Sequence, residues 1–277
     1  MSAAPRVTDH YSRGDLLARL NAALAQDGAD PQRPDVEALA PYDQFHGRGL
    51  EATEEVAGLM QAGPAAHLLD VGSGIGGPAR YFARRFGCRV TGIDLTEEFC
   101  DVATHLTRLT GLQQRVKFET ADALAMPFAD ASFDGAYSMN VSMNIADKPR
   151  LYREIRRVLK PGGWLLLSEL ARGEGPELDY PTPWAASAAT SFLSTPDATW
   201  RGLTDAGFEV VLMRSTREEA LAFGARSRAA VERGEKPPHR AVMLIHADGA
   251  KAAMANTARG LAEDRIVPIE VFCRKRA

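Results

Sequence analysis

A glycine-rich turn carries the most chemical information in this chain. The segment Leu68-Leu-Asp-Val-Gly-Ser-Gly-Ile-Gly-Gly-Pro-Ala-Arg80 is typical of a buried strand, a tight turn and the start of a helix. Glycines at positions 72, 74 and 76 let the backbone turn sharply and approach a ligand closely, and the helix start behind them offers unpaired N–H groups. Because Gly72, Gly74 and Gly77 also satisfy G-x-G-x-x-G, the fingerprint of dinucleotide sites, the turn alone indicates only a nucleotide-like cofactor.

Three aspartates near predicted strand ends narrow the choice of cofactor. Asp70 precedes the first glycine by two residues, where its carboxylate would repel a pyrophosphate and attract a cationic group such as an ammonium. Asp94, 22 residues after Gly72, can accept hydrogen bonds from both hydroxyls of a ribose, which suits either class of cofactor. Asp122 can accept an adenine amino proton; alternatively, its side chain only caps a turn.

Strand and helix patterns alternate from about residue 66 to residue 170 at the spacing of βαβ units, which predicts a parallel sheet. The helix after the first strand should begin near Pro78 and end at Gly87. The segment Lys160-Pro-Gly-Gly163 is expected to turn the chain into the fifth strand. Strands are expected at residues 67–71, 88–94, 116–122, 133–139, 164–169, 208–213 and 267–273.

Outside this pattern the sequence predicts helices that cap one end of the sheet. The first 60 residues are amphipathic and are expected to break at Pro31, Pro34 and Pro41. We expect residues 1–60 to form an N-terminal helical lid. Residues 61–277 would form the main domain, with cap insertions at about 171–195 and 216–264.

Composition limits the partners and the compartment. The chain has 277 residues, of which 45% are hydrophobic and 25% charged, as is ordinary for a globular protein. A net charge of −3 without a basic run does not suggest nucleic acid as a partner. No apolar stretch approaches a membrane span, the N-terminus lacks a signal-peptide layout, and three scattered cysteines favour neither disulfides nor zinc. We expect a cytoplasmic protein without a metal or a membrane partner; a homodimer is compatible with the sequence.

Further signatures follow the glycine turn in a fixed order: Ser132-Phe-Asp-Gly135, Leu159-Lys-Pro-Gly-Gly163, Ala206-Gly-Phe208 and a final strand. With the turn and the three aspartates, the series resembles the class I S-adenosylmethionine-dependent methyltransferases over residues 64–214 and 267–274. The resemblance implies an α/β fold with a Rossmann-like seven-stranded sheet, mostly parallel with an antiparallel last strand, and helices on both faces. It implies S-adenosyl-L-methionine as cofactor and S-adenosyl-L-homocysteine as product; a dinucleotide-dependent dehydrogenase is the alternative.

The resemblance also assigns cofactor contacts to matching positions. The glycine turn with Asp70 would hold the methionine part, Asp94 the ribose, Asp122 the adenine, and Asn140 would lie under the methionine part. For Asp122 and Asn140 the alternative is turn or helix capping. The expected cofactor-binding residues are Asp70, Gly72, Ser73, Gly74, Gly76, Asp94, Leu95, Asp122, Ala123 and Asn140.

An acceptor site is expected from the segment Pro41-Tyr-Asp-Gln-Phe-His-Gly-Arg-Gly-Leu-Glu-Ala-Thr53. In related small-molecule methyltransferases an aromatic, His and Gly segment here closes over cofactor and acceptor. The resemblance therefore gives His46 a catalytic role, orienting or deprotonating the acceptor; alternatively, His46 is a surface loop residue and Phe45 fills the core. The expected acceptor-binding residues are Tyr11, Tyr42, Gln44, Phe45, Met143, Asn144, Glu169 and Trp184.

The residues after the fourth strand bear on the acceptor atom. Met143 and Asn144 stand where many relatives that methylate sugar or quinone hydroxyls carry histidines, which favours an acceptor that is already nucleophilic. The layout most resembles the sarcosine/dimethylglycine N-methyltransferases and quinone C-methyltransferases. We therefore expect in-line methyl transfer to an amine or ring nitrogen of a small-molecule acceptor. The alternatives are O- or C-methylation of a phenol or quinone-like natural product, and a non-catalytic cofactor-binding regulatory protein.

Several single residues carry further expectations. Glu169 could bind a cationic or amino group, and Trp184 and Tyr180 could add cation–π contacts. Trp200 is expected in the core, because it shares a helical stripe with nearby apolar residues. His239 and Arg240, beside a Pro-Pro turn, are expected to be solvated.

Overall fold

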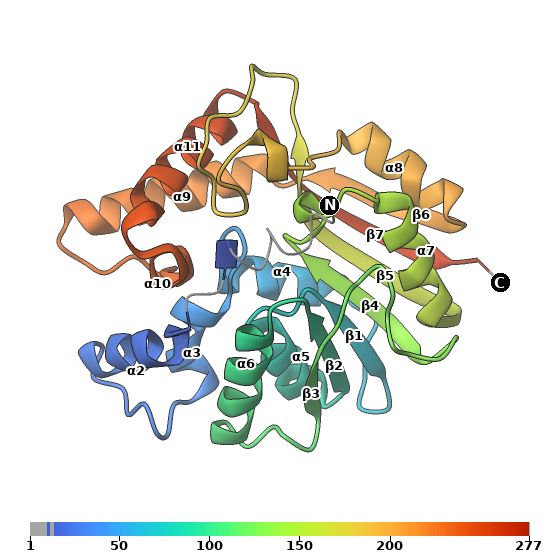
Figure 1. Ribbon diagram of the computed structural model, residues 1–277, viewed down its shortest axis with the longest axis horizontal. Coiled ribbons are helices and arrows are strands. Elements are labelled where there is room, and N and C mark those ends of the chain that lie inside the picture. The colour runs from blue at the N-terminus through green and yellow to red at the C-terminus, as the bar shows by residue number, and fades with distance from the viewer. Residues whose placement is uncertain (1–9, 12–13, 277) are drawn as a thin grey trace.

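The computed structural model describes residues 10–11 and 14–276, except for the side chain of residue 248. Within these residues the chain forms a seven-stranded sheet in the order β3-β2-β1-β4-β5-β7-β6 (Figure 1). Neighbouring strands run parallel, but β7 runs antiparallel to both β5 and β6. The predicted α/β sheet with an antiparallel last strand is therefore confirmed. The strands are β1 (His67–Val71), β2 (Arg89–Asp94), β3 (Val116–Thr120), β4 (Phe133–Met139), β5 (Leu159–Arg172), β6 (Phe208–Ser215) and β7 (Ile266–Lys275).

Helices cover both faces of this sheet, because side chains alternate between the faces along each strand. Leu69 of β1 packs in one core with Leu151 and Leu203 of two helices, whereas its neighbour Leu68 packs in a second core with Phe82 of another. The helices of the alternating pattern are α5 (Gly77–Phe86), α6 (Glu97–Leu109), α7 (Lys148–Val158) and α8 (Pro196–Asp205).

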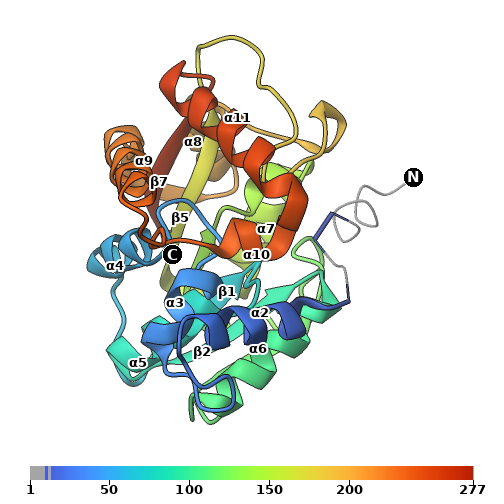
Figure 2. The ribbon, with the colours of Figure 1, turned by 90° about the vertical axis from the view of Figure 1, so that its left-hand side faces the viewer.

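Further helices gather on one side of the sheet (Figure 2). Segments far apart in the sequence meet there: Leu16 and Leu39 from the N-terminal part pack with Leu244 and Ile245 in one apolar cluster. The backbone N–H of Arg240 also donates to the carbonyl of Pro41, at 2.7 Å. These helices are α2 (Leu16–Gln26), α3 (Val36–Asp43), α4 (Leu50–Leu59), α9 (Arg217–Glu232), α10 (Ala241–His246) and α11 (Ala250–Ala262).

Three expectations about local structure are wrong. The strand β5 begins at Leu159 rather than Trp164. Gly162 adopts a φ of 74°, and the pairing of β5 with β4 accommodates the extra residues through a register shift between Phe133 and Gly135. Pro41 lies inside α3 instead of breaking it, since the helix ends two residues later and loses little hydrogen bonding. Trp200 is 47% exposed, because α8 buries the neighbouring side that carries Leu203.

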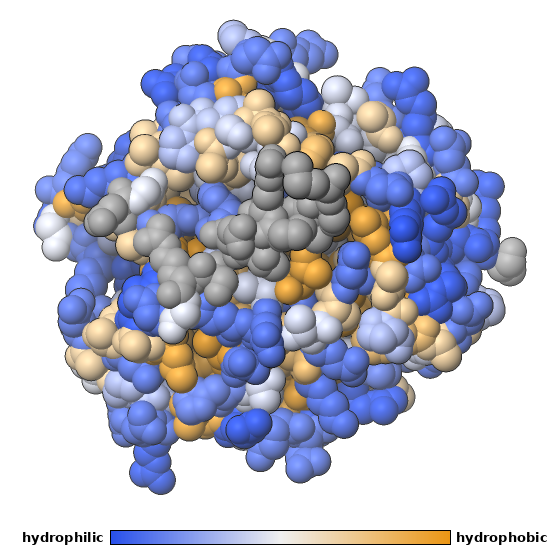
Figure 3. All heavy atoms as spheres, viewed as in Figure 1, coloured by the Kyte–Doolittle hydropathy of each residue, from blue (hydrophilic) through white to orange (hydrophobic). Residues whose placement is uncertain are grey.

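On the face seen in Figure 1, hydrophobic patches lie toward the middle among hydrophilic side chains, and the edge is mostly hydrophilic. Hydrophobic side chains gather there between the cap helices and the helices of the sheet, as Figure 3 shows. No helix in the described part of the chain is both long and apolar enough to cross a membrane.

Candidate active site

Two adjoining cavities lie between the sheet and the cap helices. The first has a volume of about 310 Å³ and is lined by residues that follow β1, β2, β3 and β4. The second has a volume of about 570 Å³ and is lined by β5 and by the cap, including α9 and α11. Tyr11, Phe45, His46 and Asn140 line both. In an open parallel sheet, ligands bind beyond the carboxyl ends of the strands, where the first cavity lies.

The glycines of the turn have two different roles. Gly72 lines the first cavity with a φ of 74°, and a Cβ there would lie 2.4 Å from a methyl group of Val141. Gly74 also lines it, with open space beside its Cα. Gly76 does not, since a Cβ there would meet the Phe118 ring at 2.4 Å. Gly77 begins α5, as expected, and lies against the backbone of Asp43.

Two polar atoms beside this turn are unsatisfied. Asp70 Oδ2 and Ser73 Oγ are buried and have no hydrogen-bond partner among the described residues, and both residues line the first cavity. Burial, with Asp94 nearby, raises the pKa of Asp70 to about 8. A buried carboxyl group in this state is stabilised as the anion when a cation binds beside it. The ammonium of S-adenosylmethionine is such a cation, so the residues present fit that cofactor.

The other expected cofactor residues surround the same cavity. Asp94 accepts hydrogen bonds from the backbone N–H groups of Gly74 and Thr96, both at 2.9 Å, and burial raises its pKa. Asp122 is exposed and accepts from the N–H of Leu124 at 2.8 Å, which is the turn-capping contact considered above. The cavity lining includes Asp70, Gly72, Ser73, Gly74, Asp94, Leu95, Asp122, Ala123 and Asn140.

Asn140 connects the sheet to the loop that carries His46. It adopts a φ of 56°, and its backbone N–H donates to the Ser168 carbonyl at 2.8 Å. In the amide orientation that satisfies both ends, Nδ2 donates to the same carbonyl and Oδ1 accepts from the N–H of Gly47, each at 3.2 Å. The end of β4 thus fixes the position of the histidine loop.

A chain of hydrogen bonds holds His46 in place. His46 Nε2 lies 3.0 Å from the Thr53 hydroxyl, which donates to Gln44 Oε1 at 2.7 Å. Gln44 Nε2 donates to Asp43 at 3.1 Å, and Asp43 pairs with Arg80 at 2.8 Å, both fully buried. This series of hydrogen bonds therefore ends at a buried ion pair between α3 and α5.

This series of hydrogen bonds assigns the tautomer of His46. The amide nitrogen of Gln44 must face the Asp43 carboxylate, so its oxygen must accept the single proton of the Thr53 hydroxyl. Thr53 can then only accept from His46, which places the ring proton on Nε2 and a lone pair on Nδ1. Nδ1 lies 3.3 Å from the carbonyl of Gly47, a tolerable contact without a proton between them. Burial lowers the pKa of His46 to about 3, so the ring is neutral.

The predicted acceptor residues divide into two groups. Tyr42 and Gln44 line neither cavity. The Tyr42 hydroxyl donates to Asp27 at 2.7 Å and its ring lies under the Arg240 guanidinium, because α3 continues through Pro41 and turns this side chain away. Tyr11, Phe45 and His46 line both cavities, Asn144 lines the first, and Met143, Glu169 and Trp184 line the second.

Two of these residues tie loops together. Asn144 accepts from the Tyr11 hydroxyl at 3.0 Å and donates to the Trp184 carbonyl at 2.7 Å. Glu169 accepts from the Ser138 hydroxyl at 2.9 Å and from two backbone N–H groups of the loop after β4, each at 3.0 Å. Both side chains thus already have protein partners.

The prediction that His239 and Arg240 are solvated is wrong. His239 lines the second cavity, and its Nε2 donates to the backbone carbonyl of Gln44 at 2.9 Å. Arg240 is largely buried and pairs with Asp27. The Pro-Pro turn beside them packs onto α3, a long-range contact that has no local signature.

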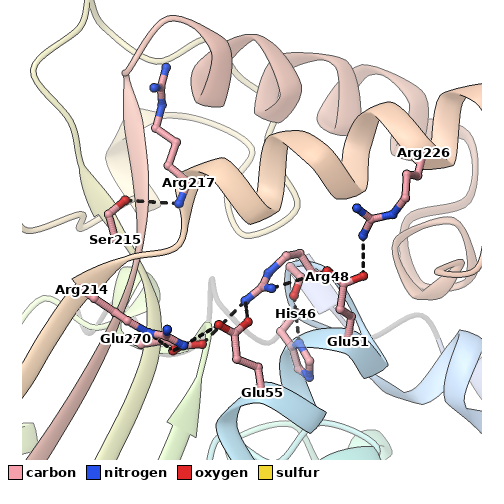
Figure 4. Close-up of polar contacts among 10 residues, drawn as sticks. His46, Arg48, Glu51, Glu55, Arg214, Ser215, Arg217, Arg226 and Glu270 are labelled. Atoms are coloured by element: carbon pink, nitrogen blue, oxygen red, sulfur yellow. Dashed lines mark hydrogen bonds and ion pairs between the residues drawn. The ribbon is translucent and has the colours of Figure 1, made fainter.

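Sequence reasoning also missed an ionic network around the buried side chain of Arg48, beside His46 (Figure 4). Arg48, with a φ of 64° and a side chain only 5% exposed, faces Glu51, Glu55 and Glu270 at 3.6, 2.5 and 3.7 Å. It comes from the same loop as His46, so the network anchors that loop to α4 and β7. Arg214 pairs with Glu55 and Glu270, and Arg226 pairs with Glu51.

Several known proteins are similar to this chain in sequence. The family described as a methyltransferase domain matches residues 69–167. A 24-methylenesterol C-methyltransferase of Oryza sativa subsp. japonica is 43% identical over 130 residues, which cover 45% of this chain and 36% of that protein. An O-methyltransferase of Pyrenophora dematioidea is 32% identical over 216 residues, which cover 76% of this chain and 78% of that protein.

A solved structure extends the comparison to the fold. Phosphoethanolamine N-methyltransferase 2 of Haemonchus contortus, in complex with phosphomonomethylethanolamine and S-adenosylhomocysteine, has a TM-score of 0.69 at 20% identity. The alignment covers 95% of this chain and 61% of that chain. This chain spans about a third of the sterol methyltransferase but most of the O-methyltransferase. The sequence match over most of both chains shows that this chain belongs to the S-adenosylmethionine-dependent methyltransferase family.

Proposed function

We propose that this protein transfers the methyl group of S-adenosylmethionine to a hydroxyl group of a small molecule bound in the second cavity. The observation that carries this proposal is the position of His46, a buried imidazole that lines both cavities and, in the tautomer assigned above, carries its lone pair on Nδ1. The relatives carry out C-, O- and N-methylation, so the choice of acceptor atom depends on this chain's own residues.

The first cavity would hold the cofactor. Asp70 would bind the ammonium group, and the unpartnered hydroxyl of Ser73 would complete its polar contacts. Asp94 would accept from the ribose hydroxyls and Asp122 from the adenine amino group. When bound there, S-adenosylmethionine supplies an activated methyl group that needs no metal or further activation.

The protein's remaining tasks are alignment, exclusion of water and proton transfer. Tyr11 and Phe45 lie at the boundary of the two cavities, where they would separate the reacting atoms from solvent. His46 Nδ1 would accept a hydrogen bond from the acceptor hydroxyl and take its proton as the new C–O bond forms. Thr53 would keep the other ring nitrogen protonated, so that Nδ1 stays a base.

A nitrogen acceptor is the second candidate, and a separate observation favours it. By the family resemblance, Met143 and Asn144 stand where many methyltransferases of sugar or quinone hydroxyls carry histidines, and Asn144 is bonded to Tyr11 and Trp184. The loop after β4 therefore offers no histidine as a base, and a neutral amine would need none. His46 supplies an imidazole from a different loop, and for this reason we place a hydroxyl acceptor ahead of a nitrogen acceptor.

The test uses two measurements that separate binding from turnover. Calorimetric titration with S-adenosylhomocysteine should show binding at one site, whereas NAD should not bind; tight NAD binding alone would reject the proposal. A screen of phenols, aliphatic alcohols, amines and imidazoles with isotopically labelled cofactor should then label hydroxyl compounds. Cofactor binding without any labelled product would favour the non-catalytic alternative.

A further inference from the structure

We infer that the acceptor is an uncharged, largely apolar molecule that fills the second cavity and presents its nucleophilic group to His46. This inference rests on the proposed function, since it names the acceptor class of the same site. It goes further, because methyl transfer itself demands no particular charge or polarity of the acceptor.

The second cavity is large and apolar. Its volume of about 570 Å³ lies within the range of sites for drug-sized ligands. Its wall carries aromatic and aliphatic side chains from segments far apart in the sequence, among them Phe45, Met143, Trp184, Phe223 and Leu261. Such a wall gains most from contact with an extended apolar surface.

The buried cation in this wall, Arg48, is already neutralised. Glu51, Glu55 and Glu270 surround its guanidinium, as described above (Figure 4). These carboxylates are shared with two further arginines, so the network contains three guanidinium groups and three carboxylates. Arg48 therefore has no surplus positive charge for a phosphate or carboxylate of the acceptor.

The anionic groups of the wall are also compensated. Glu169 uses its oxygens to accept three hydrogen bonds from the β4 strand and the loop after it. Arg228 and Glu232 also line the cavity, but both are exposed and stand one turn apart on α9 with opposite charges. The buried charged side chains in the described part of this wall, Arg48 and Glu169, thus have an ion-pair partner and hydrogen-bond partners respectively in the protein.

The remaining polar groups suit neutral partners. The Nε2 atoms of His46 and His239 bond to the Thr53 hydroxyl and the Gln44 backbone carbonyl respectively, and burial lowers the pKa of both rings. Ser227 Oγ is buried in the wall without a hydrogen-bond partner among the described residues. A neutral hydroxyl or carbonyl substituent of the acceptor would satisfy it. An ionised group buried here would lack a counter-charge, at a large cost.

A matched pair of fluorescent probes tests this inference without any turnover. N-phenyl-1-naphthylamine is neutral, and 8-anilino-1-naphthalenesulfonate has the same rings with an added sulfonate. Both are titrated into the full chain saturated with S-adenosylhomocysteine, whose own binding is measured by calorimetry. We expect the neutral probe to bind at one site and the sulfonate to bind at least about tenfold more weakly, because its charge would be buried unpaired.

A substitution in the cavity wall shows where the probe binds. Gly224 lines the second cavity from α9, and a Cβ added there would meet only the Arg228 guanidinium, at 3.5 Å. Gly224→Trp should therefore fill the cavity and abolish binding of the neutral probe while leaving S-adenosylhomocysteine binding intact. Ala225→Trp, at the next and exposed position of the same helix, is the matched control and should leave both unchanged.

The outcomes separate the inference from the proposed function. Equal or tighter binding of the sulfonate, lost in Gly224→Trp, would overturn the inference while leaving cofactor binding and methyl transfer intact. Failure of the neutral probe to bind, or binding insensitive to Gly224→Trp, would also overturn it. Loss of S-adenosylhomocysteine binding in the wild type would instead reject the proposed function.

The ionic network provides an independent check. Glu55→Gln removes one carboxylate from around Arg48 and leaves surplus positive charge in the wall. The ratio between the Kd of the sulfonate probe and the Kd of the neutral probe should then fall by about threefold to tenfold, as expected for a partly screened charge. An unchanged preference would show that the network does not set the charge selectivity, and would contradict that step of the inference.

Discussion

The two cavities that meet at His46 differ in how they treat buried charged groups. In the first, Asp70 Oδ2 and Ser73 Oγ are buried without hydrogen-bond partners among the described residues. In the second, Arg48 and Glu169 are equally buried but have protein partners. Unsatisfied buried groups are costly unless a ligand completes them. The contrast indicates that the first cavity is built for a charged, polar ligand and the second for a neutral one.

The cavities also differ in how they are assembled. The first is made of short segments that follow consecutive strands of one sheet, whereas the second joins β5 to helices from both ends of the chain. His46 belongs to both, so substitutions there and on either side of it test whether the two cavities have separate tasks.

The largest effect is expected at the shared residue. His46→Ala should lower kcat about 10²- to 10⁴-fold on a hydroxyl acceptor, since it removes the base, while the Kd for S-adenosylhomocysteine should change little. Steady-state kinetics and calorimetry on the same preparations check this, with His105→Ala on α6 as the histidine control. Unchanged turnover in His46→Ala would end its catalytic role.

The next effect concerns the charge of the first cavity. Asp70→Asn should raise the Kd for S-adenosylhomocysteine about a hundredfold, because it removes a charge-assisted contact to the ammonium.

The pH dependence of this binding follows from the same residue. The pKa of Asp70 is raised to about 8 in the ligand-free protein, and an ammonium beside it would lower that pKa. The affinity of the wild type for S-adenosylhomocysteine should therefore rise as the pH increases toward 8, because a smaller fraction of the Asp70 carboxyl groups must lose a proton when the ligand binds. This rise should be absent in Asp70→Asn. Parallel pH profiles for the two proteins would contradict the assignment of Asp70.

A smaller effect is expected for the group that positions His46. Thr53→Val removes the acceptor for Nε2–H and should lower kcat about tenfold without changing the acceptor KM, whereas Thr53→Ser should restore it. Nitrogen-15 NMR of labelled histidine reports the tautomer directly: Nε2–H in wild type and Thr53→Ser, and a shift toward Nδ1–H in Thr53→Val. The same tautomer in all three would show that Thr53 only supports packing.

The smallest effect lies at the far wall of the second cavity. Ser227→Ala should raise the KM of a polar-substituted acceptor about twofold to tenfold, the value of one neutral hydrogen bond. An acceptor lacking the neutral polar group should show no change. An equal effect on both acceptors would indicate a change in the shape of the cavity rather than a lost hydrogen bond.

The same contrast explains what the sequence could predict. The glycine turn, Asp70 and Asp94 lie within βαβ units whose pattern is local, so their strand ends and their shared cavity followed from spacing. Tyr42 was misplaced because helix α3 continues through a proline, and Gln44 because its side chain is drawn into the hydrogen bonds behind His46.

The second cavity could not be predicted from the spacing of residues in the sequence, because it depends on long-range contacts. Ser227 and His239 enter it only when the C-terminal helices pack against α3, as the bond from Arg240 to Pro41 shows. The neutralisation of Arg48 requires Glu270, which lies 222 residues later in the chain. No local pattern in the sequence relates these positions.

The most direct test of the account is the identity of the methylated atom. An acceptor from the screen is incubated with carbon-13 methyl-labelled S-adenosylmethionine and either wild-type protein or His46→Ala, and the product is examined by NMR. We predict an O-methyl product from the wild type that is nearly absent with His46→Ala. An N-methyl or C-methyl product formed equally well by both proteins would contradict the account.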